Sequence, residues 1–164
     1  MSVNKNLPHV LVLPEDDANT RLANAFHLEV DVTRLRRMQV LPAAGGWNEV
    51  LNRFKSDHVT DMIRYRNRFM VLLIDFDSNE ERLNIAQAAI PRNLSERVFV
   101  LGALSNPEGL KKVSLGSYET IGFALARDCR EDSDTTWGHD LLRHNASELH
   151  RLRMHVRPFL FQSV

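Results

Sequence analysis

The stretch VLLIDFD, residues 71–77, decides how this chain is expected to fold. Its run of aliphatic residues is typical of a strand that is buried on both faces of a parallel sheet. The run ends abruptly at Asp75 and Asp77, two carboxylates separated by one residue. A second apolar run, VLVL at 10–13, is followed in the same way by PEDD at 14–17. The two runs therefore predict two buried strands that each present carboxylates just past the carboxyl end.

The rest of the chain continues this alternation of strands and helices. Ser78, with Glu81 three residues on, has the pairing of a helix capping box. Further strands are predicted at 38–41 and 98–101, and helices at 18–27, after 45–46, from 78 to Pro91, from 117 to 129 and from about 143 to 158. Such alternation predicts right-handed βαβ units. We therefore expect an α/β fold, a Rossmann-like three-layer sandwich with a mostly parallel four-stranded central sheet plus C-terminal helices.

The domain organisation follows from length and from the place where the alternation stops. At 164 residues the chain is expected to form a single domain over 1–164. Residues 9–104 are predicted to form the α/β core and residues 117–157 a C-terminal helical extension. The hydrophobic share of 43% and the charged share of 26% are typical of a globular protein.

Composition also bounds location and partners. No apolar run approaches the roughly 20 residues of a membrane span, and the first residues lack the apolar region of a signal peptide. The single cysteine, Cys129, cannot form an internal disulfide, which is typical of a reducing compartment. The sequence therefore predicts a cytoplasmic protein without a membrane partner.

Charge is balanced over the whole chain but not along it. The formal net charge is zero, so the chain as a whole does not attract nucleic acid. Basic residues nevertheless crowd the C-terminal segment, and Arg143, Arg151 and Arg153 are candidate nucleic-acid contacts. The alternative is a solvated helix face.

The carboxylates after the first and third predicted strands are candidate metal ligands. While the backbone stays extended, Asp75 and Asp77 point to the same face of the sheet. Two carboxylates that close repel each other, and a divalent cation removes that conflict. Hard oxygen ligands favour Mg²⁺, with Mn²⁺ as an alternative, and such ions serve phosphoryl and phosphodiester transfer. The other interpretation is that these carboxylates are ordinary loop and cap residues.

A glycine pair follows the second predicted strand. Gly45 and Gly46 permit close approach of the backbone and open a helix, so they are candidate phosphate-binding residues. A tight turn with nothing bound is the alternative.

The order of these motifs resembles the Toprim domain, in particular the small Toprim proteins and the Toprim part of the OLD-family nucleases. The acidic segment after the first strand, the AAGGWNEVL turn after the second and LLIDFDSN after the third carry this resemblance, which covers about 9–104. It implies that Glu15, Asp75 and Asp77 bind Mg²⁺ and catalyse phosphodiester chemistry of nuclease type on nucleic acid. We expect DNA ahead of RNA as the partner. Leu13 and Pro14 stand where the family has Glu-Gly, and Glu15 lies two residues further on.

Other functions remain open. The chain has no P-loop pattern, so any ATP-driven step requires a partner protein that supplies the ATPase. The departure from Glu-Gly favours a second hypothesis, a catalytically degenerate Toprim that binds nucleic acid or protein without chemistry. VLVLPEDDAN also resembles a response-regulator receiver domain, in which an acidic pair and an aspartate bind Mg²⁺ and the aspartate accepts a phosphoryl group. The haloacid-dehalogenase phosphatases rank third, because Asn79 stands where their motif has threonine.

Overall fold

The computed structural model describes residues 2–113 and 115–161. Four strands form one fully parallel sheet: β1 (His9–Pro14), β2 (Met38–Val40), β3 (Arg68–Leu73) and β4 (Val98–Leu101), in the order β2-β1-β3-β4. The four-stranded α/β fold predicted from the sequence is confirmed. After β1 the chain adds β2 on one side, then crosses to place β3 and β4 on the other. The direction of winding therefore changes between β1 and β3, and ligands of open α/β sheets bind at such a point.

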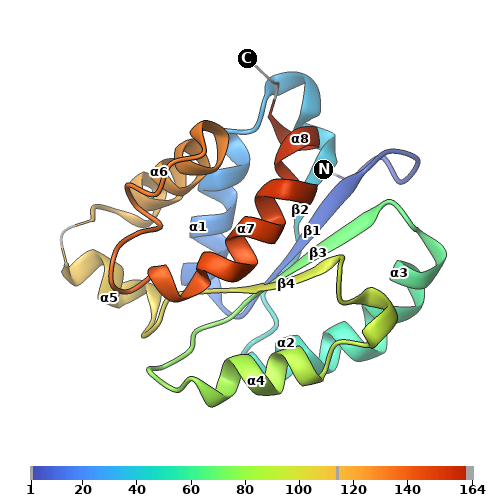
Figure 1. Cartoon of the computed structure of the whole chain (residues 1–164), viewed down its shortest axis with the longest axis horizontal. Coiled ribbons are helices and arrows are strands. Elements are labelled where there is room, and N and C mark those ends of the chain that lie inside the picture. The colour runs from blue at the N-terminus through green and yellow to red at the C-terminus, as the bar shows by residue number, and fades with distance from the viewer. Residues whose placement is uncertain (1, 114, 162–164) are drawn as a thin grey trace.

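Helices cover both faces of the sheet (Figure 1). One face carries α1 (Asp17–Leu28), α6 (Tyr118–Glu131) and α7 (Ala146–His155), and the other carries α2 (Trp47–Arg53) and α4 (Glu81–Ala88). Alternation along β1 explains the two layers, because Val10 and Val12 belong to the first core and Leu11 and Leu13 to the second. Shorter elements complete the chain: η1 (Val32–Arg37), η2 (Phe54–His58), α3 (Val59–Arg64), η3 (Arg92–Leu94), α5 (Pro107–Lys112), η4 (Arg143–Asn145) and α8 (Arg157–Leu160).

The predicted C-terminal extension forms much of one layer. Gly122 of α6 lies so close to α1 that an added Cβ would be 2.5 Å from Ala25 Cβ and 2.5 Å from Leu22 O. Because nothing larger than glycine fits there, α6 packs tightly along α1. Helix α7 crosses the sheet beside β4 (Figure 1). Residues 117–157 therefore complete the three-layer sandwich.

Side chains of η4 and α7 cover the outer edge of β4. Asn145 Oδ1 accepts from Gly102 N at 3.1 Å, and Asn145 Nδ2 donates to Gly102 O at 2.9 Å. Glu148 Oε1 accepts from Val100 N at 3.4 Å, and an Arg151 guanidinium nitrogen donates to Val98 O at 3.4 Å. These contacts satisfy backbone groups that an edge strand otherwise leaves exposed.

Two local predictions are corrected. Ser78 does not cap a helix, because it has a φ of 56° and α4 begins only at Glu81; Asn79 Oδ1 instead accepts from Glu81 N at 3.0 Å. The helix ends at Ala88 and does not reach Pro91. After the glycine pair, the helical segment continues well past α2, through the π-helical turn η2 into α3.

Candidate functional site

Three carboxylates converge where β1 and β3 end. One carboxylate oxygen from each of Glu15, Asp16 and Asp75 lies within 4.8 Å of the other two. Glu15 and Asp16 follow β1, and Asp75 follows β3, so the trio sits at the point where the winding direction changes. We call these residues the acidic trio. The acidic residues predicted after the first and third strands meet because the strand order places β1 beside β3.

Asp75 is the most buried member of the trio, with 8% of its surface exposed. The strand pairing that holds it extends past β3, because Ile74 N donates to Leu101 O and Phe76 N donates to Ala103 O. Burial raises the pKa of Asp75 to about 7, and the nearby charges of Glu15 and Asp16 act in the same direction. A cation bound here would replace the proton that this environment favours.

Glu15 reaches Asp75 in spite of the proline that precedes it. Glu15 N donates to Leu73 O at 2.9 Å, so the ladder between β1 and β3 extends one residue past Pro14. The Glu15 side chain then crosses to β3, and its Oε2 accepts from Asp75 N at 2.6 Å. Burial raises the pKa of Glu15, while this hydrogen bond lowers it. The displacement of the glutamate by two residues therefore does not remove it from the site.

Asn19 links the other two members of the trio. Asp16 caps α1, and its Oδ1 accepts from the backbone N of Asn19 at 3.0 Å. Asn19 Nδ2 donates to Asp16 Oδ1 at 3.0 Å and to Asp75 Oδ1 at 2.9 Å. Asn19 is 1% exposed, and its Oδ1 has no hydrogen-bond partner within 2–113 and 115–161. Neither Asp16 nor Asn19 was among the predicted site residues. The sequence signal that could have found them is their spacing, because an aspartate that caps a helix places the side chain three residues later beside its own carboxylate.

Asp77 does not belong to the acidic trio. The sequence predicted that it faces the same way as Asp75, which requires extended backbone. Asp77 and Ser78 instead have φ values of 51° and 56°, so the chain turns at this point. The Asp77 side chain is 69% exposed and lies 3.6 Å from an Arg82 guanidinium nitrogen. Arg82 also donates to Asp75 O at 2.8 Å, so it joins Asp77 to the border of the site.

The glycine pair lies beside the trio. Ala44 N donates to Pro14 O and Gly45 N donates to Glu15 O, so this loop pairs with the end of β1. A Cβ added at Gly45 or Gly46 would meet nothing within 4 Å, which leaves open space above the backbone. Their role in phosphate binding stays a prediction.

The three candidate arginines of the C-terminal segment differ in exposure. Arg143 has a side chain that is 71% exposed and pairs with Asp140 at 3.2 Å. Arg151 contacts Glu148 and the backbone next to β4. Arg153 is 12% exposed and holds the loop before η4 through Asp132 and Asp134. Arg151 and Arg153 are thus engaged inside the fold, which disfavours them as nucleic-acid contacts.

Comparisons with known proteins do not assign the chain to a family. No protein-family model matches it, and neither the curated proteins nor the solved structures contain a significant match. The resemblance to the Toprim domain therefore stays a prediction. Within the described residues, none of the helices has the length and apolar character needed to cross a membrane.

Proposed function

We propose that this chain is a metal-dependent phosphodiester enzyme of nuclease type that holds Mg²⁺ or Mn²⁺ at the acidic trio. The observation that carries the proposal is the convergence of Glu15, Asp16 and Asp75 within 4.8 Å at the point where the sheet changes direction. The donor set consists of hard oxygen atoms, which suits these ions. Asn19 Nδ2 donates to two of these carboxylates and so holds them next to each other. The resemblance to the Toprim domain supports nucleic acid, DNA before RNA, as the substrate.

The residues of the site have distinct tasks in this proposal. The trio holds the ion, which stabilises negative charge on the phosphate that reacts. Asn19 donates to Asp16 and Asp75 and so fixes the direction of both carboxylates. Arg82, which contacts Asp75 O and Asp77, supplies a positive group at the border of the site. Asp77 is exposed, and we assign it to the side where the substrate approaches.

Separate variants of Asp75 and Asp77 test this division of tasks. Calorimetric titration with Mg²⁺ and Mn²⁺ is expected to show binding by the wild type and a loss of at least about 100-fold in Asp75→Asn, because a buried ligand is removed. Asp77→Asn is expected to retain the ion affinity but to lose cleavage of supercoiled or single-stranded DNA. Asp134→Asn, at an exposed carboxylate remote in sequence, serves as the control. Unchanged binding and cleavage in Asp75→Asn would refute the proposal.

A receiver-like phosphoacceptor is the second candidate. The observation that favours it is the composition of the trio, in which two acidic residues come from the end of β1 and one from the end of β3, without Asp77. This candidate predicts acid-labile phosphorylation of Asp75 by a small phosphodonor, blocked in Asp16→Ala and retained in Asp77→Ala. The nuclease proposal predicts no such mass increase. Ion binding without cleavage or phosphorylation would instead identify a binding module.

A further inference from the structure

The segments that lead into the strands carry an excess of positive charge. Residues 2–8, 31–37, 61–68 and 95–97 contain eight arginine and lysine residues against three aspartate and glutamate residues. Each segment leads into one strand of a fully parallel sheet, so all four lie at the same edge, the amino edge. We call its basic residues the amino-edge band: Lys5, Arg34, Arg36, Arg37, Arg64, Arg66, Arg68 and Arg97.

The geometry of the sheet spaces these charges in a row. Neighbouring strands lie about 4.8 Å apart, so the loops before four strands extend over about 15 Å. Every strand contributes at least one basic residue to this row. A single small anion would contact only part of this row, whereas a polyanion with regularly repeated charges would extend along its whole length. The arrangement therefore favours a polymer over a small ligand.

Some members of the band build its frame and others face solvent. Arg68 is buried, with its Nε donating to His9 Nε2 at 3.0 Å, and Arg97 donates to backbone carbonyls of α3 and the loop before β3. Lys5, Arg64 and Arg66 are exposed and form no salt bridge with a carboxylate in the described part of the chain. The exposed cations are therefore available to a partner.

An aromatic ring lies among these cations. Lys5 Nζ is 5.1 Å from the centre of the Tyr65 ring, and Arg64 Cζ is 5.3 Å from it. Arg68 Cζ lies 4.9 Å from the same ring. These contacts hold the charged groups close together around the Tyr65 side chain, although like charges repel each other. Three of the eight basic residues of the band therefore lie around one ring near the start of β3.

We infer that the amino-edge band binds the phosphate backbone of a nucleic acid. The inference rests on the proposed function, because a site made of carboxylates repels a polyanion and needs attraction from elsewhere in the molecule. Arginine outnumbers lysine seven to one in the band, and the guanidinium group matches phosphate geometry. The six residues of β1 separate the two edges by about 20 Å, which is about six base pairs of duplex. One nucleic acid can therefore reach both.

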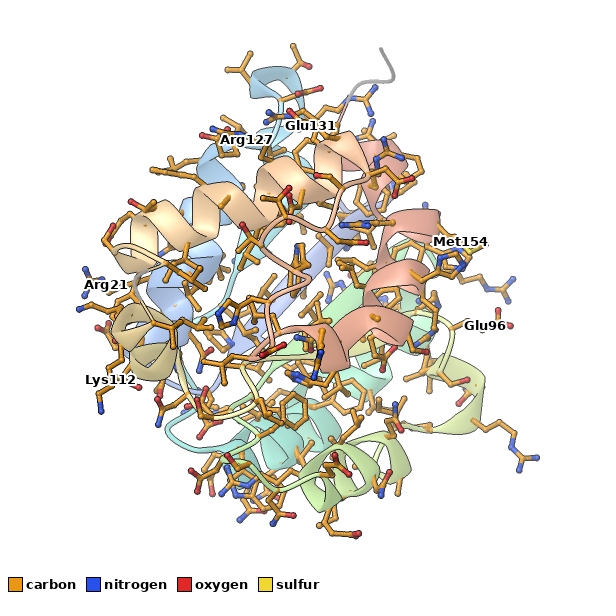
Figure 2. The ribbon with its side chains drawn as sticks, turned by 60° about the vertical axis from the view of Figure 1, so that its left-hand side comes forward. Arg21, Glu96, Lys112, Arg127, Glu131 and Met154 are labelled. Carbon is orange, nitrogen blue, oxygen red and sulfur yellow. The ribbon has the colours of Figure 1, made fainter. Side chains whose placement is uncertain are left out.

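Charge reversal at the two ends of the molecule tests the inference. The edge variant combines Lys5→Glu, Arg64→Glu and Arg66→Glu. The control variant combines Arg21→Glu, Lys111→Glu and Lys112→Glu, which changes the net charge equally at exposed positions outside the band. Figure 2 shows Lys112 on the opposite side of the molecule from Glu96, which lies in the loop before β4. Binding of a labelled oligonucleotide of about 20 nucleotides, as single strand and as duplex, is followed by fluorescence anisotropy in EDTA at about 50 and about 200 mM salt.

The edge variant is expected to lose at least about tenfold in affinity, and the slope of affinity against salt is expected to fall by about 2–3 for three lost phosphate contacts. The control variant should stay within about threefold of the wild type. Thermal melting checks that both are folded, and a variant with glutamine at the same three edge positions repeats the test with a smaller change. Equal losses in both variants, absence of salt-dependent binding, or salt-dependent self-association without nucleic-acid binding would each overturn the inference. EDTA removes any bound ion, so failure of the proposed catalysis does not affect this experiment.

Discussion

The two edges of the sheet carry opposite net charge, although the net charge of the whole chain is zero. Segments that follow the strands, 15–17, 41–46, 74–82 and 102–108, contain eight acidic residues and one basic residue. Segments that precede the strands contain eight basic and three acidic residues. In a parallel sheet these two groups of segments lie at opposite ends, so the segments next to the two ends of the strands carry opposite net charge. Equal numbers of acidic and basic residues in the chain are therefore compatible with two edges of opposite charge.

Part of this contrast follows from the fold itself. In βαβ units the helix N-termini lie at the carboxyl edge of the sheet, where the helix dipole favours acidic residues such as Asp17 and Glu81. Helix C-termini lie at the amino edge and favour basic residues such as Arg64. Asp75 differs from these helix-end residues, because it is buried and its pKa is raised although it contacts Asn19 in the first turn of α1. Asp17 and Glu81 are therefore ordinary acidic residues of a first helical turn, whereas the burial of Asp75 needs a different explanation.

The largest effect on stability is expected at Asp75 and concerns pH. An unfolded aspartate has a pKa of 3.8, while burial raises the pKa of folded Asp75 to about 7. The folded state binds the extra proton between these values, so this contribution to stability is fully present below about pH 4 and is lost as pH rises through 7. The shift corresponds to about 4 kcal/mol. Urea denaturation in EDTA measures the free energy of unfolding of the wild type and of Asp75→Asn at several pH values. The value for the wild type minus the value for Asp75→Asn should fall by up to about 4 kcal/mol between about pH 4 and pH 8.

A variant at the opposite edge provides the control for the pH experiment. Arg64→Gln with Arg66→Gln changes the amino edge and leaves the trio intact, so it should keep the pH dependence of the wild type. If the free energies of unfolding of the wild type and Asp75→Asn differ by the same amount at all pH values, then folding does not raise the pKa of Asp75. The charge difference between the two edges would in that case involve exposed residues only.

A smaller effect is expected when Asn19 is changed. Asn19→Ala removes donors to two carboxylates and should lower the free energy of unfolding by about 2 kcal/mol in EDTA. Because the carboxylates then repel each other without a neutral donor between them, added Mg²⁺ should stabilise Asn19→Ala more than the wild type, and parallel thermal melts measure the difference. Asn24→Ala, on the same helix but at an exposed position, is the matched control. An equal Mg²⁺ response in Asn19→Ala and the wild type would show that Asn19 does not act on the trio.

Much of the fold could be predicted from the sequence because its strands are short continuous apolar runs. The order of the strands could not, because it depends on which side each crossover takes. The turn at Asp77 was also missed, since contacts far along the chain hold it: Asp77 N donates to Ser105 O and Ser78 N to Leu104 O. The alternation of side chains along a strand predicts extended backbone through Asp77. The hydrogen bonds to the loop after β4 instead turn the backbone at Asp77, so its side chain points away from Asp75.

The basic residues show the same limit from the other side. Arg151 and Arg153 stood out in the sequence because they share one segment, yet the fold uses them to cover β4 and to hold a loop. Lys5, Arg64 and Arg66 lie in separate segments and attract no notice until the parallel sheet gathers its amino ends. Proximity in the sequence was therefore a poor guide to a charged surface that strand order creates.

The smallest effect on stability is expected within the amino-edge band, where the structure offers a matched pair of arginines. Arg66 is exposed, so Arg66→Gln should change the free energy of unfolding by less than about 0.5 kcal/mol. Arg68 is buried against His9 and near Asp61, so Arg68→Gln should cost about 1–3 kcal/mol. For nucleic-acid affinity the order is reversed, because only Arg66 can reach a phosphate. Urea denaturation and anisotropy on the same two proteins measure both quantities, and a larger loss of affinity in a folded Arg68→Gln than in Arg66→Gln would place the contact surface elsewhere.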